Sequence, residues 1–273
     1  MYLVDYHIHT KRCGHACGED REYVEAALKK GFREIGFSDH VPRFYEPPSS
    51  EVKVTERGMA REELDDYVES VIKLRDEYRE ISIKLGLEVD YVPSWERETE
   101  AITTQYPWDY IIGSVHFISE WNYGYIANEK EHGPEEIYPV YFDRVAQAAE
   151  SGLFDILAHV DLPKRSFPRL EPEVMTELYR DLAIRLGKAG TVIELNSYGV
   201  RGSKLGDVGV YPDQELLRFC RGQGVRVTMG SDAHRPQDVG ADFDRVTELL
   251  RKVGYREIAV FNRRKRSMVE WEA

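Results

Sequence analysis

The sequence alternates short runs of β-branched and aliphatic residues with longer amphipathic stretches, seven times along the chain. The apolar runs lie at residues 3–7, 34–39, 83–89, 110–115, 155–159, 191–195 and 226–230, and a further run, 257–261, lies near the end. They are too apolar for either face to meet water, which indicates a parallel sheet covered by helices. An open doubly wound sheet usually has a Gly-rich phosphate loop after its first strand, but that position here reads His7-Ile8-His9-Thr10. We therefore expect an α/β fold of the closed or distorted barrel type, with residues 1–273 as a single domain.

The stretches between these runs have the periodicity of helices. The apolar stripes are Leu64, Tyr67, Val68, Val71 and Ile72; Val174, Leu178, Leu182 and Leu186; and Val246, Leu249, Leu250 and Val253. A repeat of three or four residues places such side chains on one helix face. The expected left-handed residues after helices are Gly31, Gly190, Gly222 and Gly254, and the expected first helical residues are near Pro134, Pro172 and Pro212.

Composition and charge exclude several classes of protein. Acidic residues outnumber basic ones by 49 to 37, a formal net charge of −12, which is unfavourable for binding nucleic acid. No apolar stretch approaches the roughly 20 residues of a membrane span, and the N-terminus resembles no signal peptide. We expect a cytoplasmic protein without nucleic-acid or membrane partners. The basic run Arg263-Arg264-Lys265-Arg266 is expected to be a solvated strand end or tail.

Seven of the eight histidines lie at or just after the end of an expected strand. They are His7, His9, His15, His40, His116, His159 and His234, whereas His132 lies in a polar stretch before a helix. Glu88 and Asp232 occupy equivalent positions. In a barrel the strand ends converge on one rim, and imidazoles with carboxylates bind Zn²⁺, Mn²⁺ or Fe²⁺. A catalytic ion takes about three protein ligands. The nine side chains that could donate a ligand atom to a metal, here called the nine donors, therefore predict a cluster of two or three divalent ions.

Each of these signals is weak when it is taken alone. His7 and His9 are two residues apart, so on a strand both face one side and can chelate one ion. An isolated His-x-His motif, however, is more often structural, and a lone buried histidine is usually satisfied within the core. Cys13 and Cys17 flank His15 as in a zinc knuckle, but no second Cys/His pair follows at finger spacing. The prediction rests on the whole set at corresponding strand ends.

A series of motifs resembles the PHP (polymerase and histidinol phosphatase) superfamily. In chain order they are Asp5-Tyr6-His7-Ile8-His9-Thr10, Cys13-Gly14-His15-Ala16, Ile35-Gly36-Phe37-Ser38-Asp39-His40, Gly86-Leu87-Glu88, Gly113-Ser114-Val115-His116-Phe117, Ala158-His159-Val160-Asp161-Leu162-Pro163, Glu194-Leu195-Asn196 and Gly230-Ser231-Asp232-Ala233-His234-Arg235-Pro236. The motifs around His40, His116 and His234 are similar to the histidinol-phosphate phosphatase branch in particular.

The resemblance implies a distorted (β/α)7 TIM-like barrel, the PHP fold, with three metal ions at the C-terminal rim. The implied ligands are His7, His9, Glu88 and Asp232 for one ion; Glu88, His116 and His159 for a second; and His15, His40 and His234 for a third. The implied activity is that of a metal-dependent phosphomonoesterase. Its substrate is a small phosphate ester, L-histidinol phosphate, which it hydrolyses to L-histidinol and phosphate in histidine biosynthesis.

For such a reaction we expect a metal-bridging hydroxide as nucleophile, without a covalent enzyme intermediate. The residues expected to hold it are Glu88, Asp232, His7 and His9. Arg201, Arg165 and Lys164 follow expected strands and are candidates to bind the phosphate. Asp161 and Asp39 are candidates to protonate the leaving group or to orient a ligand histidine. Phe117 and Trp121 are candidates for the wall of an imidazole pocket, whereas Trp108 is expected in the core.

Three alternatives stay open at this point. A PHP-type phosphoesterase could act on another small ester, such as a nucleotide or a phosphopeptide. An amidohydrolase-type enzyme normally uses two ions and a carboxylated lysine, and no lysine lies at a matching strand end. A non-catalytic metal-binding protein would need to keep nine ligands without an open coordination position.

Overall fold

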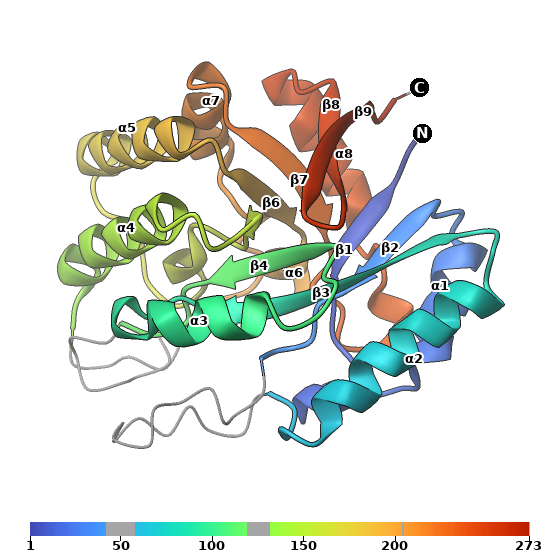
Figure 1. Ribbon diagram of the computed structural model, residues 1–273. Helices are drawn as coiled ribbons and strands as arrows, with labels where there is room; N and C mark the ends of the chain where they lie inside the picture. The colour runs from blue at the N-terminus through green and yellow to red at the C-terminus, as the bar shows by residue number, and fades with distance from the viewer. Residues whose placement is uncertain (42–57, 119–131, 204, 273) are drawn as a thin grey trace.

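The computed structural model describes residues 1–41, 58–118, 132–203 and 205–272, and a nearly closed barrel of seven parallel strands forms its centre (Figure 1). The strands are β1 (Val4–Ile8), β2 (Glu34–Phe37), β3 (Ser82–Asp90), β4 (Tyr110–Ser114), β5 (Ile156–Leu157), β6 (Val192–Asn196) and β7 (Arg226–Gly230). They are hydrogen-bonded in chain order, and each pair is parallel. Every residue of β1, β2, β4 and β6 is buried, which explains why these strands lack polar alternation. The expected α/β barrel is confirmed.

The segment after β7 brings the two edges of the sheet together. The His9 N–H donates to the Ala233 carbonyl over 2.9 Å, and the Ala233 N–H donates to the His7 carbonyl over 3.0 Å. The buried carboxylate of Asp5 accepts the Ser231 N–H over 2.8 Å. These bonds place the side chains at the end of β1 next to those that follow β7.

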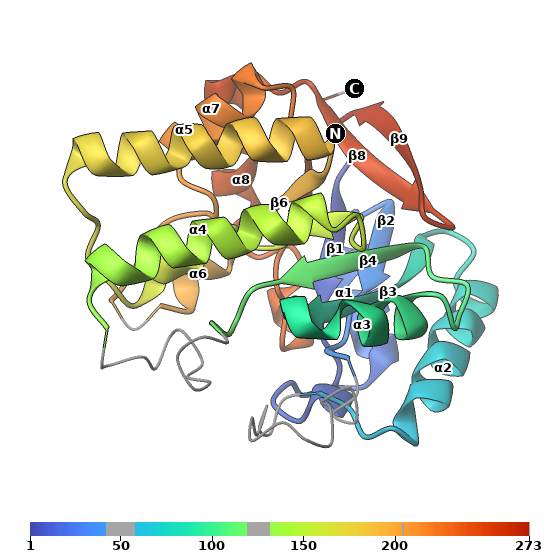
Figure 2. The same cartoon turned by 60° about the vertical axis from the view of Figure 1, so that its left-hand side comes forward.

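Helices cover the outside of the barrel (Figure 1 and Figure 2). They are α1 (Asp20–Lys29), α2 (Glu63–Glu77), α3 (Glu96–Thr103), α4 (Pro134–Glu150), α5 (Pro172–Ala189), α6 (Tyr198–Arg201), α7 (Gln214–Gly222) and α8 (Phe243–Val253). Short 3-10 helices are η1 (Lys11–Cys13), η3 (Pro93–Trp95), η6 (Leu162–Arg165) and η7 (Pro236–Asp238). Within the described ranges, no helix has both the length and the apolar character needed to cross a membrane.

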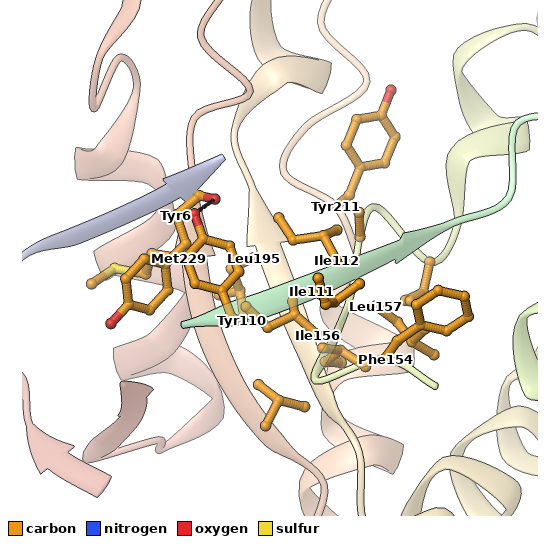
Figure 3. Close-up of a cluster of buried hydrophobic side chains, with 14 of the residues drawn as sticks. Tyr6, Tyr110, Ile111, Ile112, Phe154, Ile156, Leu157, Leu195, Tyr211 and Met229 are labelled. Carbon is orange, nitrogen blue, oxygen red and sulfur yellow. Dashed lines mark hydrogen bonds between the residues drawn. The ribbon is translucent and has the colours of Figure 1, made fainter. Parts of the chain in front are cut away.

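Tyr110 packs inside the barrel against strand glycines. Its hydroxyl donates to the Tyr6 carbonyl over 2.7 Å, and the two ring centres are 4.8 Å apart (Figure 3). A Cβ added at Gly36 would lie 2.2 Å from the Tyr110 hydroxyl, and one at Gly86 would lie 2.4 Å from its ring. Because Tyr110 is the first residue of β4, this packing fills the barrel at the end where the strands begin and leaves the opposite end to polar side chains.

The last apolar run forms a strand outside the barrel sheet. β8 (Glu257–Asn262) pairs antiparallel with β9 (Lys265–Glu270), and the two-residue turn between them has left-handed φ values of 49° at Arg263 and 61° at Arg264. Of the two expected forms, a solvated strand end or a tail, the structure shows the strand end, because the basic run forms the turn and the first residues of β9, with Arg263, Lys265 and Arg266 exposed. The Arg264 N–H donates to the Asp109 carbonyl over 2.9 Å and anchors the turn beside the start of β4.

Candidate metal centre

The structure brings the nine predicted donors together at the C-terminal ends of the strands. His7 lies in β1 and His9 directly follows it, His15 follows η1, His40 follows β2, Glu88 lies in β3, His116 follows β4, His159 follows β5, and Asp232 and His234 follow β7. Seven are buried, namely His7, His9, His40, Glu88, His116, His159 and Asp232. So many buried polar donors at one point are unfavourable unless a cation or hydrogen bonds satisfy them.

Glu88 lies between two pairs of imidazoles. Its Oε2 is 3.4 Å from His7 Nε2 and 3.5 Å from His9 Nε2. Its Oε1 is 3.5 Å from His159 Nε2 and 3.9 Å from His116 Nε2. The same division appears among donor atoms within 4.8 Å of one another, where Glu88 belongs both to a set with His7 and His9 and to a set with His116 and His159. One carboxylate is therefore shared by two potential ion sites.

Asp232 lies beside the first of these sets. Its Oδ1 is 3.3 Å from His9 Nε2 and 3.8 Å from His7 Nε2. The N–H and the C=O of Ala233 are both hydrogen-bonded, to the backbones of His7 and His9. These bonds hold the carboxylate of the preceding residue, Asp232, beside the two histidine rings.

His15 and His234 face one another with their Nε2 atoms 2.7 Å apart. Nδ1 of His15 is 3.1 Å from the Cys13 carbonyl, and Nδ1 of His234 is 3.0 Å from the Asp232 carbonyl. A carbonyl only accepts, so in the neutral rings each Nδ1 carries the hydrogen and each Nε2 presents a lone pair. Two facing lone pairs need a proton or a metal ion. His234 also belongs to donor sets with His9 and His40, and with Cys13 and His15.

Unpaired buried atoms show that the residues fit a divalent cation. His7 Nε2 and His9 Nε2 have no hydrogen-bond partner within the described part of the chain, whereas Glu88 Oε2 lies 2.9 Å from His40 Nδ1. A buried polar atom without a partner costs about 1–3 kcal/mol. One divalent ion accepts both imidazole and carboxylate ligands and would satisfy the two imidazole nitrogens.

Two further carboxylates hold ligand imidazoles by the other ring nitrogen. Glu194 Oε1 is 2.8 Å from His7 Nδ1, and Asp90 Oδ1 is 2.8 Å from His116 Nδ1. Such contacts fix the ring orientation and raise the basicity of the nitrogen that faces the metal. A Cβ at Gly230 would lie 1.8 Å from Glu194 Oε1, so the absence of a side chain there makes room for the contact.

Glu194→Gln is expected to weaken binding of the ion beside His7 by about 10- to 100-fold. The amide loses the negative charge and brings an N–H group toward Asn196, whose own amide donates to Glu194 Oε2 over 2.9 Å. Elemental analysis after dialysis against graded chelator concentrations measures the effect. Asp90→Asn is the matched variant and should weaken the ion beside His116 instead. Equal loss of both ions in either variant would contradict the division into two sets.

The electrostatics of the site keep its carboxylates ionised. Burial raises the pKa of Glu88, but the imidazoles of His40 and His7 outweigh burial and hold this pKa well below its usual range. Burial also raises the pKa of Asp232, but His7, His9 and His234 together outweigh it and hold that pKa well below its usual range. Burial lowers the pKa of His7, yet the carboxylates of Glu194, Asp232 and Glu88 raise it well above its usual value. The surroundings of His7 thus favour a positive charge.

A cavity opens onto the donors. Seven of the nine line it, all except His7 and His9, together with Leu162, Arg165, Tyr198 and Tyr211. Its volume is about 460 Å³ with the open mouth included. Arg165 is the only lysine or arginine among the described lining residues, and its guanidinium lies 5.2 Å from the centre of the Tyr198 ring.

Lys164 occupies a different position from its neighbour Arg165. Its Nζ is buried, 2.9 Å from Asp161 Oδ2, 3.1 Å from Asp213 Oδ1 and 2.8 Å from the Val210 carbonyl. These three contacts use all three N–H groups, so the expectation that Lys164 binds phosphate is corrected. Asp161 is outside the cavity lining, and burial raises its pKa. The Lys164–Asp213 pair joins η6 to the segment before α7, and the Asp213 N–H donates to Asp161 Oδ2 over 2.8 Å.

Asp39 and Arg201 also hold segments of the rim in place. Asp39 accepts the Thr10 N–H over 2.8 Å, and burial raises its pKa to about 7. The Arg201 guanidinium donates to the Ser231 carbonyl and lies 3.2 Å from Asp242 Oδ2. Arg201 does not line the cavity.

The aromatic wall differs from the expected one. Tyr198 and Tyr211 line the cavity, and sequence reasoning missed both, although Tyr198 follows β6 at the rim. Phe117 packs beside the donors but is not among the lining residues. Trp108 is buried in the core as expected, and Trp121 lies outside the described residues.

A seven-stranded parallel barrel with clustered imidazoles and carboxylates at its C-terminal rim defines a divalent-metal centre of the kind that hydrolytic enzymes use. The model of the PHP domain family matches residues 5–198. The chain belongs to this family.

Similar proteins extend the likeness over nearly the whole chain. A probable histidinol-phosphatase from Deinococcus radiodurans is 35% identical over 268 residues, which cover 96% of this chain and 98% of the relative. The histidinol-phosphatase of Bacillus subtilis is 31% identical over 272 residues, which cover 91% of this chain and 99% of the relative. The crystal structure of histidinol phosphate phosphatase from Lactococcus lactis, complexed with Zn, L-histidinol and phosphate, has the same fold. Its TM-score is 0.80 at 21% identity, with 97% and 98% of the two chains covered.

Proposed function

We propose that this protein hydrolyses L-histidinol phosphate to L-histidinol and inorganic phosphate in histidine biosynthesis. The observation that carries the proposal is the position of Glu88, whose two oxygens face two sets of imidazoles in a cavity that also presents Arg165. Relatives named histidinol-phosphatase, at 35% and 31% identity over nearly the full length, support the choice of substrate. We assign all 273 residues to one domain, since the β8–β9 hairpin packs on the barrel.

We assign the nine donors to two or three ions of zinc, manganese or iron. The first ion takes His7, His9, Asp232 and Glu88; the second takes Glu88, His116 and His159; and a third takes His15, His40 and His234. The distances from Glu88 support the first two sets. The facing Nε2 atoms of His15 and His234 support the third.

The chain's own residues bind and orient the phosphate ester. When bound, the divalent ions would neutralise the non-bridging phosphate oxygens and lower the pKa of a coordinated water. Arg165 presents a planar fork of N–H groups that matches two phosphate oxygens. Lys164 and Asp161, buried behind the wall, keep η6 and hence Arg165 in position. We therefore assign Asp161 an orienting role.

The aromatic wall suits the leaving group. Tyr198, Tyr211 and Leu162 line the cavity beside the donors. Flat aromatic faces and an aliphatic side chain can pack against the imidazole ring of L-histidinol and exclude water from it.

Arg165→Ala is expected to lower kcat/KM for phosphate release by about 10²-fold, because the charged fork on the phosphate is lost. The kcat/KM of Arg165→Lys should lie between those of the wild type and of Arg165→Ala, since lysine keeps the charge without the fork of N–H groups. Steady-state kinetics at constant metal content provide the measurement. Arg185→Ala, which removes an arginine of α5 that pairs with Glu150, is the control and should change nothing. An effect of less than twofold for Arg165→Ala would contradict its role.

The proposed function is tested by phosphate release from L-histidinol phosphate, AMP, phosphotyrosine and an aryl phosphate, with bound metals counted on the same sample. We expect L-histidinol phosphate to be preferred by about 10²-fold or more in kcat/KM. A preference for another ester would overturn the substrate but leave the phosphoesterase class. No activity on any ester by fully metal-loaded protein would overturn the enzyme itself.

A further inference from the structure

The outer edge of β9 carries backbone groups that no described residue satisfies. Among the described strands, β9 pairs only with β8, and Asn262↔Lys265 is the pair that closes the two-residue turn. Hydrogen-bonded pairs in such a hairpin alternate from the turn, and the Trp271 N–H bonded to the Arg256 carbonyl fits this alternation. The N–H and C=O groups of residues 266, 268 and 270 therefore point away from β8. Figure 2 shows β9 as the outer strand of the hairpin.

The charges along β9 are divided between its two ends. Arg266 lies at one end, and burial together with the neighbouring Arg226 lowers the pKa of its guanidinium. Glu270 lies at the other end, directly opposite Glu257 of β8. Like charges that face each other across two strands are unfavourable. Within the described ranges, neither Glu257 nor Glu270 forms an ion pair, so the glutamate end of the strand has like charges that lack a counter-charge.

We propose that β9 pairs antiparallel with β9 of a second copy of this chain, about a two-fold axis through Met268. On the outer edge of β9, only the even-numbered residues present their N–H and C=O groups. Each hydrogen-bonded pair across the axis must therefore join an even-numbered residue of one copy to an even-numbered residue of the other. The register with the greatest overlap places Met268 opposite Met268 and Arg266 opposite Glu270 of the second copy. Each glutamate thereby gains the cation that its own protomer does not supply.

The charge pattern selects the second copy in this orientation. A parallel pairing would place Arg266 against Arg266 and Glu270 against Glu270, and a slipped register would lose the Arg–Glu pairs. The hairpin turn contacts Asp109 at the start of β4, so the paired edge lies at the barrel end opposite the cavity and leaves both cavities open. One short strand pair is a small interface, so we expect a dimer of micromolar affinity.

Sedimentation velocity from about 1 to about 200 µM, a range that spans micromolar affinities, tests the proposal on the full chain. The wild type should pass from monomer to dimer. Met268→Pro removes one outward N–H and leaves the bonds to β8 intact, so it should remain monomeric, whereas Met268→Ala keeps that N–H and should dimerise. Arg266→Glu or Glu270→Arg should raise the dimer Kd by about tenfold or more, and the double exchange should restore it.

Every outcome of this experiment bears on the proposal. Phosphatase activity and thermal midpoint, measured in parallel, show that each variant is folded, and neither should change. A wild type that stays monomeric to the highest concentration would overturn the proposal. A dimer that survives Met268→Pro would place the interface elsewhere. Failure of the Arg266→Glu/Glu270→Arg double variant to recover dimerisation would overturn the register.

Discussion

Replacing Glu88 by glutamine is expected to reduce phosphate release by at least about 10³-fold, equivalent to about 4 kcal/mol of transition-state stabilisation. The variant keeps the size of the side chain but removes one of the two anionic oxygens that face separate imidazole pairs. The amide nitrogen cannot accept a metal bond, so one ion loses a ligand and the bridge between the sites is broken. Activity assays and metal counting on the same samples should show both losses together.

The matched control for this experiment is the eighth histidine. His132 is paired with Glu136 over 2.6 Å at the start of α4 and takes no part in the cavity lining. His132→Gln should therefore keep full activity and full metal content. A Glu88→Gln variant that retains all its ions and more than about a tenth of the activity would show that Glu88 does not bridge them.

Removal of the metal is expected to abolish activity and to lower the thermal midpoint by about 5–10 °C, as for a ligand that contributes a few kcal/mol to the folded state. Without ions, the Nε2 lone pairs of His15 and His234 stand 2.7 Å apart, and the buried His9 Nε2 has no hydrogen-bond partner among the described residues. Dialysis against a chelator, followed by calorimetry and activity assays, measures both effects. Zn²⁺, Mn²⁺ or Fe²⁺ should restore activity and midpoint together.

Two results would contradict this account of the metal centre. One is activity that persists in protein shown to be metal-free by elemental analysis. The other is a thermal midpoint that does not change on metal removal, since the donors would then be satisfied in another way.

The barrel and the nine donors could be predicted because each follows from a strong physical constraint. Strands buried on both faces must be apolar throughout, and this makes them visible in the sequence. Parallel strands point their carboxyl ends to one rim, so residues such as His7 and His159, more than 150 positions apart, could be expected side by side. The position of Glu88 between the two sets was implied only by the family resemblance, because it depends on the tilt and register of β3.

The exposed faces of the helices were harder to predict. Ile72 and Val174 are expected in apolar stripes but are 39% and 44% exposed. From Val174, steps of four residues drift by about 40° each around a helix of 3.6 residues per turn, so Leu186 lies on another face. In α5, Met175 and Tyr179 take the buried positions instead. A step of four alone therefore does not define a helix face.

The choice between neighbouring cations also required the structure. Lys164 and Arg165 are adjacent in η6, so their side chains point in different directions, and only Arg165 reaches the cavity. Lys164 pairs with the carboxylates of Asp161 and Asp213, and Asp213 lies 49 residues after it in the sequence. Such a distant contact has no local signal in the sequence. The same holds for Glu194, which lies 187 residues from the His7 ring that it orients.

The most direct test of the central claim is a crystal structure of the protein as purified, with anomalous diffraction recorded at the zinc, iron and manganese edges. We expect one ion bound by Glu88 Oε2 with His7, His9 and Asp232, and a second bound by Glu88 Oε1 with His116 and His159, at about 2.0–2.2 Å from nitrogen and oxygen ligands. Anomalous peaks away from the nine donors, or a Glu88 carboxylate that contacts no ion in metal-loaded crystals, would contradict the account.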